Sequence, residues 1–301
     1  MSFLRAAIQM LVFPGLVYAL LASFFMLWLQ RKINARLQGR IGPPFYQPFF
    51  DFVKLLGKEP IKRPALQGFA MAALPIAAVA ATLGAVALLP VLPSGAGFPG
   101  DLVLLVALIE VGPLLAVLGG FASRSMWGEL GAAREAVMTA AYNLPFLTAL
   151  IALGWTSDLS ISRLATTAPW SVRLLALAAI LLCLPAKLHL NPFSISSAEQ
   201  EIYAGVNTEY DGPRLALWEL SHGLEWVALT GLFAVLSVPL AGVADVWRIL
   251  AFLAISLLVV VVLSVAAAST ARLKLAQTAR WFWLWGLLLA GSALGLTLAG
   301  I

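Results

Sequence analysis

Carboxylates and imidazoles occur in this chain within stretches that are otherwise apolar, where they could carry protons. Glu219, His222 and Glu225 follow one another at steps of three residues, so a helix would place them on adjoining turns, about 4.5 Å apart in rise. Histidine titrates near physiological pH, and flanking carboxylates would complete a proton relay. A set of interhelical hydrogen bonds that holds a helical bundle together is the alternative role for these three residues.

Glu110 is an isolated acid within a long apolar segment. It lies nine residues after Asp101, which is about 13 Å along a helix and near the middle of a membrane. An ionisable residue at that depth costs about 2.5–3.5 kcal/mol on insertion, which makes it a candidate for function. We expect Glu110 to carry protons; an ion pair with a Lys or Arg of another helix is the structural alternative.

Two further groups of charged residues lie at the edges of apolar segments. Glu129, Arg134 and Glu135 precede or begin one of these segments. A helix dipole favours acids at such a position, so a helix-start role competes with a role in proton transfer. The polar connection at 189–213 holds the second group, for which solvation of a loop is the alternative role: His189, Glu199, Glu201, Glu209 and Asp211.

The residue types argue against a metal or redox cofactor in this chain. It has one cysteine, Cys183, and two histidines that are not at ligand spacing. An iron–sulfur cluster or a structural zinc needs about four such ligands. The sequence also lacks a glycine-rich loop that could hold a phosphate. We therefore expect no metal and no cofactor here, and a buried structural role for Cys183.

The elements that must position these residues are transmembrane helices. Hydrophobic residues make up 61% of the chain and charged residues 11%, against about 25% charged residues in soluble domains. Backbone groups in lipid must satisfy their own hydrogen bonds, which predicts helices. We expect one all-α membrane domain over 1–301, a polytopic bundle whose eight spans lie near 8–29, 67–92, 101–122, 131–155, 171–188, 214–238, 246–268 and 281–300.

The positive charges predict the orientation of the bundle. With the N-terminus outside, fifteen of the nineteen Lys and Arg residues, Lys187 among them, fall on the inner side. This satisfies the positive-inside rule for the cytoplasmic (inner) membrane of a prokaryote. The net charge of +5 is then a consequence of topology, and no nucleic-acid partner is expected. The first apolar run is too long for a cleavable signal peptide.

The inner connection at 30–66 concentrates charge, with eight of the nineteen Lys and Arg residues. Apolar residues from Phe49 to Leu56 predict an interfacial amphipathic helix after the first span. The helix either anchors the chain to lipid or docks a partner. The residues that we expect to form a docking surface are Arg36, Gln38, Arg40, Pro43, Pro44, Gln47, Pro48, Asp51, Lys54, Lys58 and Glu59.

Three blocks of sequence resemble a known family. They are Arg36-Leu-Gln-Gly-Arg-Ile-Gly-Pro-Pro-Phe-Tyr-Gln-Pro-Phe-Phe-Asp-Phe-Val-Lys-Leu-Leu-Gly-Lys-Glu59, then Gly131-Ala-Ala-Arg-Glu135, then Ala198-Glu-Gln-Glu-Ile202 with Thr208-Glu-Tyr-Asp-Gly-Pro213. In this order they resemble the membrane subunit shared by respiratory complex I (subunit 1, or H type) and the group 4 energy-converting membrane-bound NiFe hydrogenases, including formate hydrogenlyase. The first block is more similar to the hydrogenase branch.

The resemblance implies a membrane-anchor and coupling subunit that docks a redox module and links electron transfer to proton or ion translocation. Implied partners are NiFe hydrogenase-like large and small subunits, an iron–sulfur subunit and antiporter-like membrane subunits. The iron–sulfur clusters and the NiFe centre would belong to those partners. The alternative within the family is the quinone-site subunit of a complex I-like NADH or ferredoxin:quinone oxidoreductase, with quinone as its ligand. Alternatives from other classes are a stand-alone secondary transporter and a purely structural anchor.

The chain departs from the family pattern at several positions. Asn143 replaces a usual glutamate, Lys187 and His189 stand where glutamates are expected, and Ser194 and Ser197 stand where acids are common. The resemblance implies that protons pass these points by other groups, with His189 as a substitute carrier and Lys187 paired with a remaining carboxylate. The translocated ion, proton or sodium, and the electron donor and acceptor stay open.

Overall fold

The computed structural model describes residues 11–91, 98–155, 157–238 and 244–300, over which the chain forms helices and no strands. The elements are α2 (Leu16–Leu37), α3 (Gln47–Leu56), α4 (Ala65–Ala87), α5 (Asp101–Ala122), α6 (Met126–Gly154), α7 (Ile161–Thr167), α8 (Trp170–Lys187), α9 (Glu199–Ile202), the 3-10 turn η1 (Gly205–Glu209), α10 (Gly212–Ser237), α11 (Asp245–Ser269), α12 (Leu275–Trp281), the π-helical turn η2 (Phe282–Gly286) and α13 (Leu287–Leu298).

The predicted bundle of eight spans is confirmed, because eight helices in the described part are long and apolar enough to cross a membrane. The last of them runs from Leu275 through η2 to Leu298. The first span is displaced from the prediction: 8–29 was expected, α2 covers Leu16–Leu37, and residues 8–10 lie outside the described part. The apolar run ends near Gln30, but the polar residues after it are good helix formers and continue the helix.

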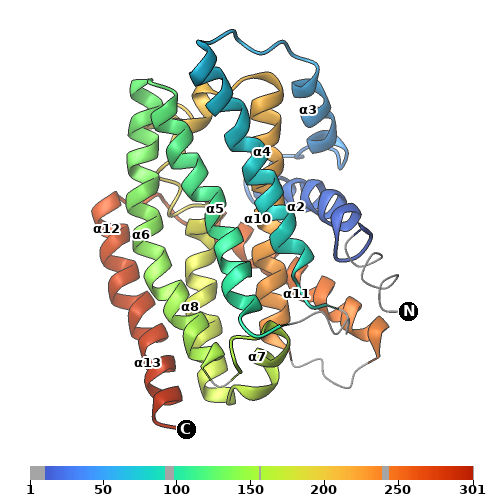
Figure 1. Ribbon diagram of the computed structural model, residues 1–301, viewed down its shortest axis with the longest axis vertical. Helices are drawn as coiled ribbons and strands as arrows, with labels where there is room; N and C mark the ends of the chain where they lie inside the picture. Colours follow the sequence, from blue (N-terminus) through green and yellow to red (C-terminus); the bar gives the residue numbers. More distant parts are fainter. Residues whose placement is uncertain (1–10, 92–97, 156, 239–243, 301) are drawn as a thin grey trace.

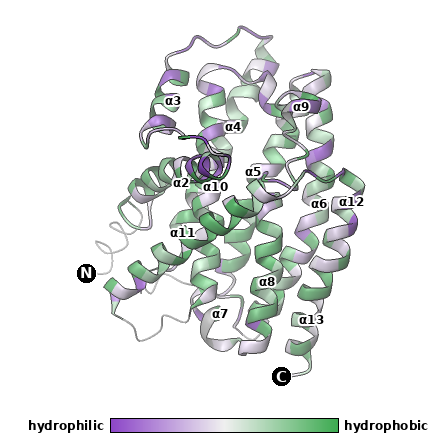
Figure 2. Cartoon of the chain, turned by 180° about the vertical axis from the view of Figure 1, so that it is seen from behind, coloured by the Kyte–Doolittle hydropathy of each residue, from purple (hydrophilic) through white to green (hydrophobic). Residues whose placement is uncertain are grey.

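The helix α10 forms the centre of the bundle and is the most buried span. It contacts α2, α4, α8 and α11, while α6 contacts α5, α8 and α13. Figure 1 shows α4, α5, α6, α8, α10 and α13 along the long axis, with α2 and α11 lying obliquely beside them. The hydrophilic residues concentrate around α3, α9 and the nearby end of α10 (Figure 2).

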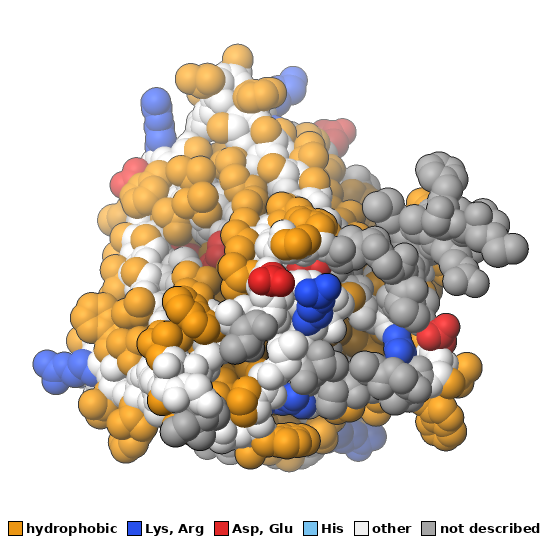
Figure 3. Space-filling view, turned by 60° about the horizontal axis from the view of Figure 1, so that its bottom comes forward, with side chains coloured by type: hydrophobic (Ala, Val, Ile, Leu, Met, Phe, Trp, Pro, Cys, Tyr) orange, Lys and Arg blue, Asp and Glu red, His pale blue; other side chains and the backbone are white. Residues whose placement is uncertain are grey.

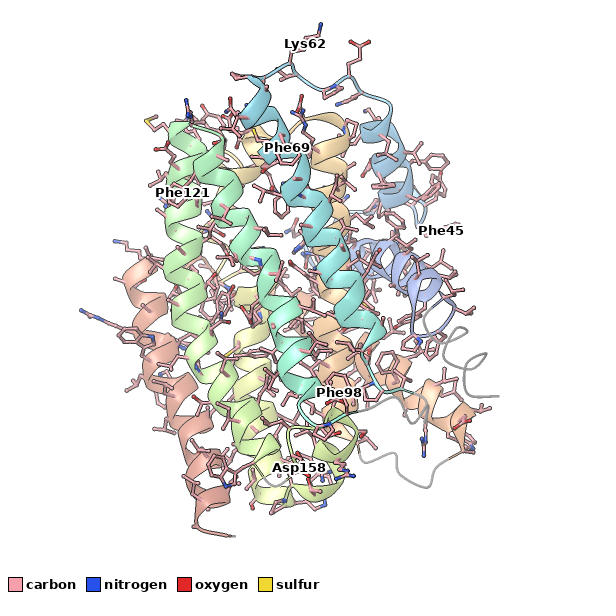
Figure 4. The ribbon with its side chains drawn as sticks, viewed as in Figure 1. Phe45, Lys62, Phe69, Phe98, Phe121 and Asp158 are labelled. Atoms are coloured by element: carbon pink, nitrogen blue, oxygen red, sulfur yellow. The ribbon has the colours of Figure 1, made fainter. Side chains whose placement is uncertain are left out.

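The two ends of the bundle differ in charge. Lys62, in the connection between α3 and α4, lies at one end, and Asp158 lies at the other (Figure 4). Seen from the Asp158 end, the surface is largely hydrophobic with scattered charges (Figure 3). The connections rich in Lys and Arg thus gather at the Lys62 end, as the topology predicts. Which end faces the cytoplasm remains a prediction.

The two long polar connections, 30–66 and 189–213, pack against each other. The backbone N–H of Ile61 donates to Asp211, and the Arg63 guanidinium bonds to Glu209. Gly212 has a φ of +47°, and a Cβ there would lie 2.9 Å from the Lys58 carbonyl oxygen. A residue with a side chain is strained in this left-handed conformation and too large for the contact, which accounts for glycine at this position.

The helix α8 is short and ends inside the bundle. Its last residue, Lys187, bonds to Glu110, which is the tenth of the 22 residues of α5. Lys187 is 2% exposed, so it is buried between helices and does not contribute to a charged surface. The connection that follows therefore begins at depth and rises to the surface at α9 and η1. Near its start, this connection contacts the segment between α11 and α12, since Leu273 N–H donates to Pro192 O over 2.9 Å.

Candidate functional site

Glu110 is the centre of a polar cluster halfway along α5, in which Lys187 is buried and Glu110 and Asn143 are partly buried. The Lys187 ammonium donates to Glu110 Oε1 and, over 2.8 Å, to Asn143 Oδ1. Asn143 Nδ2 donates to Glu110 Oε2 over 2.6 Å, which closes a triangle among α5, α6 and α8. The structure therefore contains the ion pair that was the structural alternative for Glu110. Its presence does not exclude proton transfer, since the pair can exchange a proton internally.

Aromatic rings form the apolar wall of this cluster. Lys187 Nζ lies 4.7 Å from the centre of the Tyr142 ring and 4.3 Å from that of Phe146. Both aromatic residues are fully buried. A desolvated ammonium over a ring face gains about 2 kcal/mol. This attraction offsets part of the cost of placing Lys187 in lipid-surrounded protein.

Glu135, which is buried, forms a second pair with the partly buried His189. His189 Nε2 lies 3.0 Å from Glu135 Oε2, and Thr139 Oγ1 donates to Glu135 Oε1 over 3.3 Å. Thr139 also shares a hydrogen bond of 3.1 Å with the Tyr142 hydroxyl. The Tyr142 ring in turn faces Lys187. Hydrogen bonds therefore lead from Glu135 through Thr139 to the Tyr142 hydroxyl, and the face of the Tyr142 ring contacts Lys187 of the first pair.

The block Gly131-Ala-Ala-Arg-Glu135 has a geometric explanation. A Cβ on Gly131 would lie 2.8 Å from Gly205 Cα, so glycine lets the α6 and η1 backbones approach closely. One turn later Arg134 binds Glu201 over 2.7 Å and the Ile195 carbonyl over 3.4 Å. Glu135 then points inward to His189. This turn of α6 therefore holds the 189–213 connection through Arg134 and places the Glu135 carboxylate next to His189 of the same connection.

Glu219, His222 and Glu225 lie on α10 as the three-residue spacing predicts, but they do not form one bonded relay. His222 Nδ1 lies 3.7 Å from Glu225 Oε2, and Trp226 Nε1 donates to His222 Nε2 over 3.3 Å. Glu219 instead points towards Arg31, at 4.0 Å. Glu225 is buried beside Gly112 of α5, where a Cβ would lie 2.3 Å from Glu225 Oε1.

A cavity of about 280 Å³ connects these groups. Its wall includes His189, Glu219, His222 and Glu225. The His189 and His222 rings are 5.8 Å apart between centres, too far for a direct hydrogen bond. Water in a polar cavity of this size can bridge such a gap. The cavity thus brings the α10 residues to the His189–Glu135 pair.

Two more cavities lie next to this one. A cavity of about 250 Å³, the amide-lined cavity, shares Gln30, His189 and Ser197 with the first and reaches Asn34 and Arg272. A cavity of about 290 Å³ lies between α2, α3 and α10, with Arg31, Asp51 and Glu219 in its wall. Glu219 therefore lines both this cavity and the first.

Electrostatics favour the charged form of His189. Burial would lower its pKa, but the Glu135 carboxylate, through its charge and its hydrogen bond, together with the charge of Glu225, raises the pKa of His189 to about 9. The side chain keeps 27% of its surface exposed to the cavity. His189 is therefore a cation at neutral pH that can exchange its proton with water.

The structure separates the other predicted acids from this cluster. Glu129 is exposed in the first turn of α6, as the helix-start alternative describes. Glu201 binds Arg134, and Glu209 and Asp211 hold the 57–63 segment. The side chain of Glu199 lies outside what the structure describes, although its backbone begins α9.

The predicted docking residues divide into two sets. The first set shapes the connection: Pro43 O accepts from Trp28 Nε1 and Lys32 Nζ, and Asp51 binds Gln47 and Arg31. Pro48 is buried at the start of α3, and Pro44 accepts from Gln47 N–H. The second set is exposed and could contact a partner: Arg36, Gln38, Arg40, Lys54, Lys58 and Glu59.

Sequence reasoning missed two members of the cluster and undervalued two others. Thr139 and Tyr142 were missed because they carry no charge and lie in a largely apolar segment. Asn143 was noted only as a departure from a family pattern, whereas Lys187 was expected to pair with a remaining carboxylate, and Glu110 is that carboxylate. Thr139 and Asn143 do share a helical face with Glu135, at steps of four residues. That stripe of polar residues was the available signal.

The cluster contains groups that can bind and release protons. Within the part of the chain that the structure describes, no group of three His, Cys, Asp or Glu side chains could hold a metal ion. The carboxylates, the imidazole, the amine and the phenol lie at hydrogen-bond or ring-contact distance from a neighbour in the cluster. All of these groups can exchange protons.

Comparison with known proteins gives two findings. A family model described as NADH dehydrogenase matches residues 8–298. The chain is also similar to a chain in the structure of the membrane-bound sulfane sulfur reductase (MBS), an archaeal respiratory membrane complex. The two are 26% identical, the match covers 98% of this chain and 99% of the other, and the TM-score is 0.84.

Proposed function

Because the chain belongs to the NADH dehydrogenase family, the membrane-subunit family of complex I and its relatives, we propose that it anchors a peripheral redox module and couples electron transfer in that module to proton movement. It is a membrane subunit of a complex I-related respiratory complex. Beyond this membership, we propose a coupling role for the chain, a route for the protons and the nature of the redox module.

The observation that carries the proposal is the series of polar side chains that extends from the cavity towards the centre of α5. Glu225 and His222 line the cavity, His189 forms its wall and pairs with Glu135, and Thr139 and Tyr142 lead to the Lys187–Glu110 pair. Buried ionisable groups in membrane helices are costly and are kept where they serve a path. A purely structural anchor has no need for several ionisable side chains placed one after another in this way.

The docking surface lies over the same region. The exposed set from Arg36 to Glu59 and the 189–213 connection lie next to the cavity walls. A change of charge in a module bound there would act on His189, Glu201 and Glu219 at short range. Coupling in this proposal is electrostatic, and the electrons stay in the clusters of the partners.

For the module we propose a NiFe hydrogenase-like pair of large and small subunits with an iron–sulfur subunit, alongside antiporter-like membrane subunits. The amino-acid sequence of the 36–59 segment supports this choice, because it is more similar to the hydrogenase branch of the family than to complex I. A second candidate is a sulfur-reducing module, which the similarity to the sulfane sulfur reductase chain favours. Under the quinone alternative, the cavity between α2, α3 and α10 would receive the ligand.

Purification of the intact complex from its native membrane tests the nature of the module. The detergent-solubilised complex would be assayed for hydrogen evolution from a reduced viologen, for sulfide release from polysulfide and for quinone reduction. We expect hydrogen evolution. Sulfide release without hydrogen evolution would assign the second candidate, and inhibitor-sensitive quinone reduction alone would reverse the proposal. Purification of the chain by itself as a homo-oligomer would instead indicate a secondary transporter.

A further inference from the structure

The Lys187 ammonium fills a small site made of oxygen atoms and aromatic faces. An ammonium has three N–H donors. Two of them go to Glu110 Oε1 and Asn143 Oδ1, and the Tyr142 and Phe146 rings lie within 5 Å of Nζ, at 4.7 and 4.3 Å. Carboxylate and carbonyl oxygens with ring faces are the groups that hold small cations in proteins. The site therefore already contains its cation, tethered to α8.

The orientation of Asn143 is fixed by the same contacts. Its Nδ2 donates to Glu110 Oε2 over 2.6 Å, which turns its carbonyl oxygen towards Lys187. The amide thus contributes an oxygen to the ammonium and a donor to the carboxylate. With this arrangement every close polar partner of Nζ is an acceptor, and Lys187 is only 2% exposed.

Charge balance then distinguishes the two candidate ions. One carboxylate and one ammonium give the site a net charge of zero. A sodium ion would have to compete with the ammonium for the same two oxygens, and it would leave one uncompensated positive charge in a buried position. Such a charge is strongly disfavoured away from water.

A proton can pass this site without any change in net charge. Transfer of a proton from Lys187 Nζ to Glu110 Oε1 breaks one N–H bond and forms one O–H bond, which leaves a neutral amine and a neutral carboxylic acid. A water molecule then gives a proton to the Lys187 amine, and a second water molecule accepts the proton of the Glu110 acid. The ion pair is then restored, and one proton has moved.

We propose that Lys187 determines the ion specificity of this chain, which conducts protons past Glu110 and excludes sodium. The inference rests on the proposed function, since it names the ion that the coupling path carries. It predicts that removal of the Lys187 side chain converts the site into a receptor for a free small cation.

The first experiment uses the intact complex with Lys187→Ala. Its melting temperature would be measured with methylammonium, sodium or N-methyl-D-glucamine chloride at one ionic strength. We expect methylammonium to raise the melting temperature of Lys187→Ala in a concentration-dependent manner, and to leave the wild type unchanged. The matched control is Glu110→Gln/Lys187→Ala, which lacks the carboxylate and should not respond. Absence of a response in Lys187→Ala, or an equal response in the control, would overturn the proposal.

The second experiment needs no change at Lys187 and therefore does not depend on how well that variant folds. Electron transfer by the detergent-solubilised complex would be measured against sodium concentration for the wild type and for Glu110→Gln. We expect the same half-saturating sodium concentration within twofold, or no sodium dependence in either. A shift of tenfold or more would show that sodium binds at Glu110. Neither the melting temperature nor the sodium dependence of electron transfer requires ion transport. A negative result in these experiments would therefore refute the role of Lys187 without refuting the coupling proposal.

Discussion

The residues of the buried cluster differ in how far their sequence context reveals them. Glu110, Glu135 and His189 could be nominated because ionisable side chains near apolar segments are rare and costly. The resemblance implied a carboxylate partner for Lys187, but which carboxylate could not be predicted, since 77 residues separate Lys187 from Glu110 and the contact depends on where α8 ends. Thr139 and Tyr142 became visible only through their contacts. Single residues thus revealed the chemistry of the site, while its connections required the fold.

The pKa of His189 leads to a prediction about stability. The pKa in the folded protein is raised from 6.5 to about 9, so the charged His189–Glu135 pair stabilises the fold fully below about pH 6.5. This contribution is lost as the pH rises through about 9. We expect the melting temperature of the wild-type complex to fall over this range relative to His189→Gln, measured by a thermal-shift assay in detergent. Parallel curves for the two proteins would contradict the prediction.

At the scale of elements, hydropathy identified all eight spans, because a length of about 20 apolar residues is set by the bilayer itself. It placed the first span wrongly, since the polar end of α2 continues the helix beyond the apolar run. Composition also could not show that α8 stops at the depth of Glu110. Close approaches between elements, such as that of α6 to η1 at Gly131, depend on backbone geometry that a hydropathy pattern does not encode.

That close approach can be tested with a matched pair of substitutions. A Cβ on Gly131 would lie 2.8 Å from Gly205 Cα, whereas one on Gly291 of α13 meets nothing within 4 Å. We expect Gly131→Ala to destabilise the protein by about 1–3 kcal/mol through overpacking. Gly291→Ala should be neutral or stabilising by up to about 1 kcal/mol, because alanine favours helix. Melting temperatures of the two complexes check this, and equal values would contradict the assigned contact.

At the scale of the whole molecule, the 30–66 and 189–213 connections pack against each other. The 57–63 segment and the 209–212 segment are joined by Arg63–Glu209 and Asp211–Ile61. The cavity with His189 and His222 in its wall includes Ser197 and Asn207 of the second connection, and His189 pairs with Glu135 on α6, the helix that also carries Asn143 of the Glu110–Lys187 cluster. A module seated over these two connections would therefore be linked to the centre of the membrane by exchangeable protons.

The ratio of protons taken up to electrons transferred, measured on the complex in proteoliposomes, tests the coupling account most directly. The comparison is between the wild type, Glu110→Gln and the control Glu129→Gln, whose side chain is exposed and lies apart from the buried cluster. We predict that electron transfer continues in all three, while the ratio falls at least twofold in Glu110→Gln and stays at the wild-type value in Glu129→Gln. A wild-type ratio in Glu110→Gln would contradict the account and leave the chain as a structural anchor.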